Sequence, residues 1–270
     1  MLLEKIQQNA SLLAEHPAYR CGEEFLTYSQ LWNAACLLAA QLQDGAGAVA
    51  LIGTKQPMMA VGMLGSLLAG RPYLPLSSDQ PKERLQRILS QANPGTVIDC
   101  REAKAEQWLK REPATQNFLI PGDPSWDAYW LFTSGSSGSP KGVRISLAAL
   151  ENFVRWFCAL PAIRSRKEPG AALNQAQFSF DLSVADLWPA WMMGETVFAL
   201  EPSQQADLDK LYRALGESGA TRMSCTPSFA RLCLCDKSFQ RELMPALQTV
   251  FFCGETLPAR TVRQLRQRFP

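Results

Sequence analysis

Short apolar runs alternate with longer segments of helical spacing along most of this 270-residue chain. Four to six apolar residues between turn residues indicate a strand, and apolar residues repeating every three or four positions indicate a helix. The predicted strands cover 48–53, 73–76, 96–99, 171–174, 195–200, 222–225 and 249–253. The predicted helices cover 29–42, 57–69, 81–91, 147–160, 182–193, 208–218 and 258–268. This order predicts an α/β fold in which mostly parallel strands are connected by helices that pack on the sheet faces.

Two polar segments interrupt this alternation. Residues 101–126 are polar and contain prolines, which is typical of a surface connection. Residues 164–170 read Arg-Ser-Arg-Lys-Glu-Pro-Gly, and such a charged turn is a candidate boundary. We therefore predict two sheet-based lobes with flanking helices, the first over residues 1–165 and the second over residues 166–270.

The composition excludes several classes of function. Lys and Arg number 27 against 25 Asp and Glu, so a net charge of +2 gives no general attraction to nucleic acid or to an anionic membrane. The longest apolar stretch, 58–69, is too short to span a bilayer, and charged and amide residues interrupt the N-terminus before a signal-peptide core could form. The sequence predicts a cytoplasmic protein with no membrane insertion and no nucleic-acid partner.

Histidine and cysteine chemistry is limited as well. His16 is the only histidine, so neither a Ser-His-Asp triad nor a multi-histidine metal site can be built from this chain. The eight cysteines lack zinc or thioredoxin spacing, and most are interpreted as small buried hydrophobic residues. No metal site is predicted from the chain's own side chains, and any catalysis would depend on positioning and electrostatics.

A strand-like run ending at Phe132 leads directly into a loop of small residues with one cation. Glycine allows close backbone approach to phosphate oxygens, hydroxyls add donors, and the lysine supplies charge. The spacing differs from the Walker pattern, because Pro140 precedes the lysine and Gly142 follows it. A flexible Gly/Ser linker is the alternative interpretation. The candidate phosphate-binding residues in loop 133–142 are Thr133, Ser134, Gly135, Ser136, Ser137, Gly138 and Lys141.

Asp181 stands at the mouth of the helix predicted over 182–193. A carboxylate there could cap the helix, because it accepts hydrogen bonds from unpaired backbone N–H groups and favours the helix dipole. It could equally face a ligand, and the spacing alone leaves the two roles open.

The loop 133–142, Thr-Ser-Gly-Ser-Ser-Gly-Ser-Pro-Lys-Gly, resembles the signature loop of the adenylate-forming enzymes. Segments 26–31, 68–76 and 180–183 are similar to further core motifs of that family and occur in the same order. The resemblance implies that the loop wraps the β- and γ-phosphates of ATP, used with Mg²⁺. It also implies that Asp181 pairs with the α-ammonium of an amino acid substrate.

Within that family, segments 178–184, 226–229 and 252–258 resemble the D-alanine:D-alanyl carrier protein ligases. This resemblance implies activation of D-alanine and transfer to the phosphopantetheine thiol of a carrier protein, in the decoration of cell-surface polymers. Cys253 matches the pocket cysteine that favours the D-isomer, and a buried small hydrophobic residue is the alternative. The alternative functions are activation of another small amino acid and a non-catalytic module that has kept the fold.

In the family, the sequence continues beyond the position of Pro270 with segments that bind adenine, Mg²⁺ and ribose, and with a mobile domain that carries the catalytic lysine. The resemblance therefore implies that this chain matches the N-terminal half and that its second lobe is incomplete at the C-terminus. The expected explanations are a truncated form, a proteolytic fragment or a degenerate gene product. We expect no catalytic residue within these 270 positions, and no adenylation by the chain alone.

Overall fold

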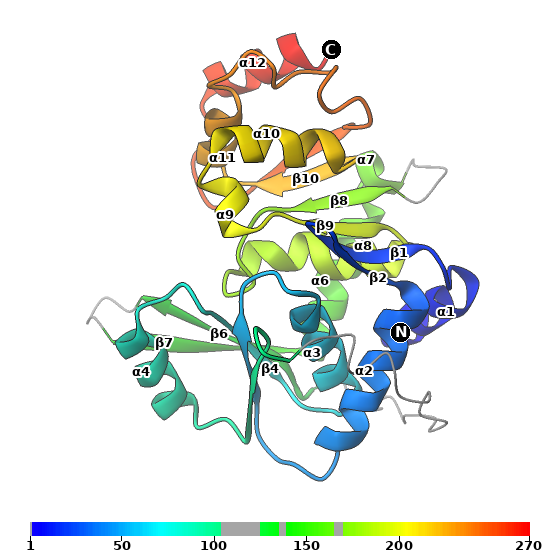
Figure 1. The fold of residues 1–270 in the computed structure, drawn as a ribbon, viewed down its shortest axis with the longest axis vertical. Coiled ribbons are helices and arrows are strands. Elements are labelled where there is room, and N and C mark those ends of the chain that lie inside the picture. The colour runs from blue at the N-terminus through cyan, green and yellow to red at the C-terminus, as the bar shows by residue number, and fades with distance from the viewer. Residues whose placement is uncertain (1, 104–124, 135–138, 165–169) are drawn as a thin grey trace.

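The computed structural model describes residues 2–103, 125–134, 139–164 and 170–270. Figure 1 shows two sheets with flanking helices, one above the other along the long axis of the molecule. The prediction of an α/β fold with two sheet-based lobes is confirmed. The predicted boundary near residue 165 falls outside the described residues, so the division into domains 1–165 and 166–270 stays a prediction.

The first sheet has five strands in the order β5-β3-β4-β6-β7. All its pairings are parallel except that of β6 with β7. Its strands are β3 (Val49–Gly53), β4 (Tyr73–Ser77), β5 (Thr96–Asp99), β6 (Asp127–Ser134) and β7 (Pro140–Ser146). The helices of this part are α2 (Tyr28–Leu42), α3 (Pro57–Leu68), α4 (Lys82–Ala92) and α6 (Leu147–Ala159). Each of these helices had been predicted to within two residues.

The second sheet has six strands in the order β11-β10-β8-β9-β1-β2. Its strands are β1 (Pro17–Cys21), β2 (Glu24–Thr27), β8 (Ala171–Asn174), β9 (Thr196–Ala199), β10 (Arg222–Cys225) and β11 (Thr249–Phe252). Its helices are α1 (Leu2–Leu12), α7 (Pro161–Arg164), α8 (Val184–Met193), α9 (Pro202–Gln205), α10 (Leu208–Glu217), α11 (Pro227–Cys233) and α12 (Ala259–Arg268). The short hairpin β1–β2, which sequence reasoning missed, pairs with β9 and so attaches the N-terminus to the C-terminal sheet.

Local sequence explains where helix α2 begins. The Thr27 hydroxyl accepts a hydrogen bond from the backbone N–H of Gln30 at 3.3 Å, and the Gln30 side chain accepts one from the Thr27 N–H at 2.9 Å. This reciprocal capping box satisfies two backbone donors that the first turn leaves unpaired. The helix therefore begins at Tyr28, one residue before the predicted start.

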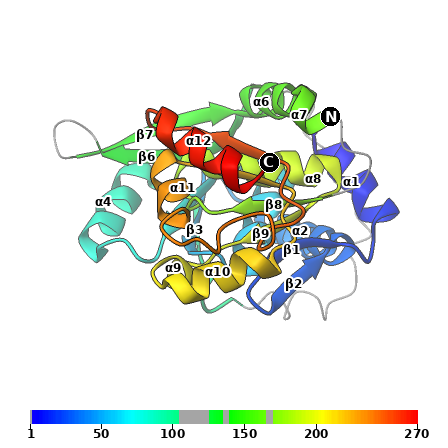
Figure 2. The same cartoon turned by 90° about the horizontal axis from the view of Figure 1, so that it is seen from above.

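Side chains of the second sheet alternate between its two faces. Ala172 and Val197 pack in the core cluster that contains α8, whereas Leu173 and Phe198 pack in the cluster that contains α10. This period of two is what a strand buried on both faces requires. Figure 2 shows α8 and α10 on opposite sides of β8 and β9. Helix α8 thus lies between this sheet and the first lobe.

The contact between the two lobes depends on aromatic residues. Trp188 of α8 is fully buried, and its indole N–H donates to the Tyr73 hydroxyl of β4 at 2.9 Å. The rings of Tyr73 and Trp188 are 6.0 Å apart between centroids, which is within the range of favourable aromatic pairs. One hydrogen bond therefore joins the helix of the second lobe to the central part of the first sheet.

We expect Tyr73→Phe to lower the free energy of unfolding by about 1–3 kcal/mol, because the buried indole N–H of Trp188 loses its acceptor. Urea denaturation measures this change. Tyr212→Phe is the matched control: the Tyr212 hydroxyl donates to the Cys233 carbonyl at 3.1 Å, but the tyrosine is only half-buried. Equal losses in the two variants would contradict the special role of the Tyr73–Trp188 contact.

Candidate functional site

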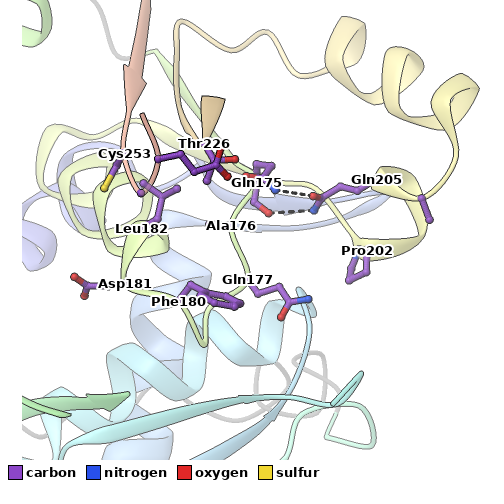
Figure 3. Close-up of a pocket in the computed structure, with 13 residues that line it drawn as sticks. Gln175, Ala176, Gln177, Phe180, Asp181, Leu182, Pro202, Gln205, Thr226 and Cys253 are labelled. Atoms are coloured by element: carbon purple, nitrogen blue, oxygen red, sulfur yellow. Dashed lines mark hydrogen bonds between the residues drawn. The ribbon is translucent and has the colours of Figure 1, made fainter. Parts of the chain in front are cut away.

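A pocket of about 740 Å³ opens where four parallel strands of the second sheet end (Figure 3). Residues 175–177 follow β8, Pro202 and Gln205 follow β9, Thr226 follows β10, and residues 253–255 follow β11. Residues 180–182 complete this lining at the start of the turn before α8. In open α/β sheets, ligands bind outside the carboxyl ends of the strands, so this pocket is the candidate site.

Asp181 begins the single 3₁₀ turn Asp181–Ser183 that leads into α8. Its carboxylate accepts a hydrogen bond of 2.8 Å from the hydroxyl of Tyr129 on β6. Burial raises the pKa of Tyr129 well above its usual value, with smaller contributions from Tyr73 and Asp181, so this hydroxyl remains a donor at neutral pH. Neither the 3₁₀ turn nor α8 has a side-chain cap, so Asp181 does not act as a helix cap.

Cys253 follows directly after β11 and its thiol is exposed at the pocket. The interpretation of this residue as a small buried hydrophobe is therefore wrong, although five of the other cysteines are buried as expected. In Figure 3 the Cys253 thiol and the Asp181 carboxylate lie on the same side of the pocket. Glu255 accepts a hydrogen bond of 3.1 Å from the backbone N–H of Ser228, which fixes the loop that carries Cys253.

Two glutamines that sequence reasoning missed form another wall of the pocket. The Gln175 side chain donates to the Gln205 amide oxygen at 2.9 Å, and the Gln205 amide donates to the Gln175 carbonyl at 3.0 Å (Figure 3). Gln205 also donates to the carbonyl of Leu200 at 3.1 Å. The sequence did indicate this wall in one way: the polar segment Gln-Ala-Gln directly follows the carboxyl end of the predicted strand 171–174, where ligands bind in such sheets.

The predicted phosphate loop joins β6 and β7, which pair in register at Thr133 and Lys141. Lys141 is exposed, and the Thr133 hydroxyl lies 3.5 Å from the Lys141 carbonyl. Neither residue lines the pocket beside Asp181. Gly135, Ser136, Ser137 and Gly138 fall outside the described residues, as does the side chain of Ser134. The structure thus brings Asp181 and Cys253 together and leaves the phosphate-binding set as a prediction.

A cluster of buried charges joins α8 to the second sheet. Arg222 of β10 donates to Glu195 at 2.7 Å, and its guanidinium lies 3.6 Å from the Asp186 carboxylate on α8. Asp186 also accepts from the backbone N–H of Ser224 at 3.2 Å and from the Asn174 amide at 3.4 Å. Lys55, in the connection between β3 and α3, donates to the Asn174 side-chain oxygen and to the Ala176 carbonyl.

Burial dominates the titration of this cluster. It raises the pKa of Asp186 from 3.8 to about 6, against the stabilising effects of Arg222, Ser224 and Asn174. It lowers the pKa of Lys55 from 10.5 to about 7, against the favourable charge of Asp186. Both shifts have the sign that desolvation imposes on a charged group.

Neither a metal-binding group nor a membrane-spanning helix occurs in the described ranges. No three His, Cys, Asp or Glu side chains approach one another as a metal-binding group in the ranges that the structure describes. Within those same ranges, no helix has the length and hydropathy that crossing a bilayer requires.

Solved structures share this fold. The N-terminal subdomain of Klebsiella oxytoca NpsA, solved in complex with 3-hydroxyanthranilyl-AMSN, superposes with a TM-score of 0.82 over 98% of this chain and 69% of that chain, at 21% identity. The nonribosomal peptide synthetase FmoA3, solved bound to AMPPNP, gives a TM-score of 0.86 over 100% of this chain and 30% of its own, also at 21% identity. At such identities the likeness establishes the fold, which is that of the N-terminal subdomain of adenylate-forming enzymes.

The chain belongs to the AMP-binding enzyme family, which matches residues 6–270. It is 35% identical to a D-alanine--D-alanyl carrier protein ligase of Bacillus licheniformis, over 100% of this chain and 56% of that protein. It is 33% identical to the protein of the same name from Staphylococcus haemolyticus, over 95% of this chain and 54% of that protein. The chain thus spans about half the length of the curated relatives that it matches.

The shifted pKa of Lys55 predicts how stability depends on pH. Between the folded pKa of about 7 and the unfolded value of 10.5, the unfolded chain holds a proton that the folded protein has lost. The Lys55 contribution to the free energy of unfolding therefore increases with pH above 7, by at most about 1.4 kcal/mol per pH unit, and is lost as pH falls through 7.

Urea denaturation of the wild type and of Lys55→Met between pH 7 and 8.5 isolates this contribution. Both proteins contain the same buried cysteines, whose own titration therefore cancels in the difference between the two curves. We expect the stability of the wild type to rise with pH relative to that of Lys55→Met. Parallel curves would show that Lys55 titrates near its ordinary value.

Proposed function

We propose that this protein belongs to an ATP-dependent ligase that activates D-alanine as an aminoacyl-adenylate and transfers it to the phosphopantetheine thiol of a carrier protein. The single observation that carries the proposal is the Asp181 carboxylate, which lines the pocket and is oriented by the Tyr129 hydroxyl. The names of the relatives at 31–35% identity favour D-alanine and a carrier protein as substrates.

In the proposed first step, a carboxylate oxygen of D-alanine attacks the α-phosphorus of ATP, the bond to the bridging oxygen breaks, and pyrophosphate leaves. In the second, the carrier thiol loses its proton and its sulfur displaces AMP from the acyl carbon. Both steps require alignment and charge neutralisation more than an acid–base pair. Asp181 would hold the substrate ammonium, and Cys253 would contact the Cα substituents and favour the D-isomer.

Thr133 and Lys141 would act on the ATP, together with residues 134–138 of the same loop and with Mg²⁺. A lysine at the end of a loop of glycines and hydroxyls offers the one charge that a polyphosphate needs there. Because the reaction consumes ATP, we place it in the cytoplasm.

Amino-acid-dependent exchange of radioactive pyrophosphate into ATP tests the proposal on the full-length protein that the gene encodes. We expect D-alanine to support exchange much better than L-alanine, glycine or D-serine. Exchange supported best by another amino acid would favour the alternative substrate, and no exchange with any amino acid would favour a non-catalytic module.

We expect Asp181→Asn to raise the KM for D-alanine about 10- to 100-fold, because one charge-assisted hydrogen bond is worth roughly 1.5–3 kcal/mol. The KM for ATP should change less than twofold. Propionate, which lacks the ammonium, is the matched control: the poor exchange that it supports should be the same in the wild type and in the variant. An unchanged KM for D-alanine would remove Asp181 from the substrate site.

A further inference from the structure

Lys55 is a buried cation of the first lobe that donates hydrogen bonds to residues of the second lobe. It follows β3, its side chain is 1% exposed, and both of its hydrogen-bond acceptors belong to the segment that leaves β8, 119 and 121 residues further along the chain. The Tyr19 hydroxyl donates to the Lys55 carbonyl at 2.8 Å, which holds the lysine backbone in place. A buried ammonium is costly unless it is fully paired, so its position here calls for a physical explanation.

The surroundings of the Lys55 ammonium match its three N–H donors. Two donate to the Asn174 amide oxygen and the Ala176 carbonyl, and the nitrogen also lies 4.0 Å from the centroid of the Phe178 ring. The two oxygens accept, and the ring face attracts a cation. The charge of Asp186 favours the ammonium form of Lys55, and the Asn174 amide accepts from Lys55 and donates to Asp186 at 3.4 Å.

The contact with Ala176 connects this lysine to the pocket. Ala176 lies between Gln175 and Gln177, and all three residues line the pocket beside Asp181. From the other side, Gln205 holds the same segment through its hydrogen bonds with Gln175. Among the described residues, Lys55 is the only one whose side chain donates to the Ala176 carbonyl.

We propose that Lys55 is a positioning residue for the amino acid substrate, which fixes the pocket wall at residues 175–177 from the first lobe. The identity of the ligand in this inference rests on the proposed function, whereas the contact between Lys55 and the pocket wall does not depend on it. A charged donor gives hydrogen bonds roughly twice as strong as a neutral one, so the ammonium holds the wall more firmly than an amine would. A shift of about 1 Å in such a wall is enough to weaken a substrate contact severely.

The other charged or titratable groups around Lys55 come from several elements. Asp186 on α8 and Cys21 on β1 act on Lys55 directly. Glu201 after β9 acts on Cys21, and Arg222 on β10 pairs with Asp186 and with Glu195 before β9. Burial raises the pKa of Asp186 only to about 6, and burial together with Glu201 raises the pKa of Cys21 far above neutrality. Burial lowers the pKa of Lys55 to about 7, so between pH 6.5 and 8 Lys55 changes its charge more than Asp186 does.

The test compares Lys55→Met with the wild type by pyrophosphate exchange in the full-length protein, with a panel of amino acids that includes D-alanine. We expect the KM for the activated amino acid to rise roughly tenfold or more, while the KM for ATP changes less than twofold. In the wild type the KM for the amino acid should rise as pH increases from 6.5 to 8, and this dependence should be absent from Lys55→Met.

Arg71→Met is the matched control for lost stability. Arg71 is also a buried cation that donates to backbone carbonyls, at 2.8 Å to Ala46 and 2.9 Å to Gly47, but these lie in the first lobe away from the pocket. We expect Arg71→Met to lower the melting temperature and to leave the KM for the amino acid unchanged. Equal increases in KM in both variants would show that Lys55 acts through general stability and would overturn the proposal.

Amide hydrogen exchange of residues 175–177 separates this inference from the proposed function, because it needs no substrate. We expect faster exchange there in Lys55→Met than in Arg71→Met, whichever amino acid is activated and even if none is. If Lys55→Met fails to fold, the wild type alone decides: after correction for the intrinsic rate, its exchange at these amides should increase from pH 6.5 to 8, whereas amides that exchange only through global unfolding should not show this increase. Unchanged protection at these amides would contradict the positioning role.

Discussion

The packing of helix α8 between the two sheets is the constraint on which the rest of the structure depends. Trp188 and Trp191 are fully buried, and their rings meet edge to face with centroids 5.3 Å apart. Aromatic residues of this size bury a large apolar area, and Trp188 also donates the hydrogen bond to Tyr73 of the first sheet. The same helix carries Asp186 into the buried charge cluster, and the turn before it presents Asp181 to the pocket. Displacing α8 would therefore disturb the contact between the lobes and the candidate site together.

Buried ion pairs further fix the orientation of the elements that this packing brings together. Arg222, Glu195 and Asp186 are each at most 2% exposed, and such buried charges persist only when they are paired. Arg222 also donates to the backbone carbonyls of Ala185 and Asp186, which fixes the first turn of α8 against the strand β10. The cluster therefore fixes the orientation of α8 relative to β10.

The sequence predicted most of the regular elements, because apolar periodicity reports local burial. It did not predict the hairpin β1–β2, whose place depends on pairing between Tyr19 and Val197 across the chain. Gly22, with a φ of +58°, marks the hairpin turn and was the available signal. For the site, motif resemblance selected Asp181 and Cys253, which the structure places on one pocket. Lys55 was missed, because nothing near it in sequence reveals a partner 119 residues away.

The most direct test of the account is a crystal structure of the protein soaked with D-alanine. We expect an amino acid in the pocket at the carboxyl ends of β8, β9, β10 and β11. Its ammonium should lie within hydrogen-bond distance of the Asp181 carboxylate, with Tyr129 still bound to Asp181 and the substrate methyl beside Cys253. D-alanine bound elsewhere, or bound here with its ammonium directed away from Asp181, would contradict the account.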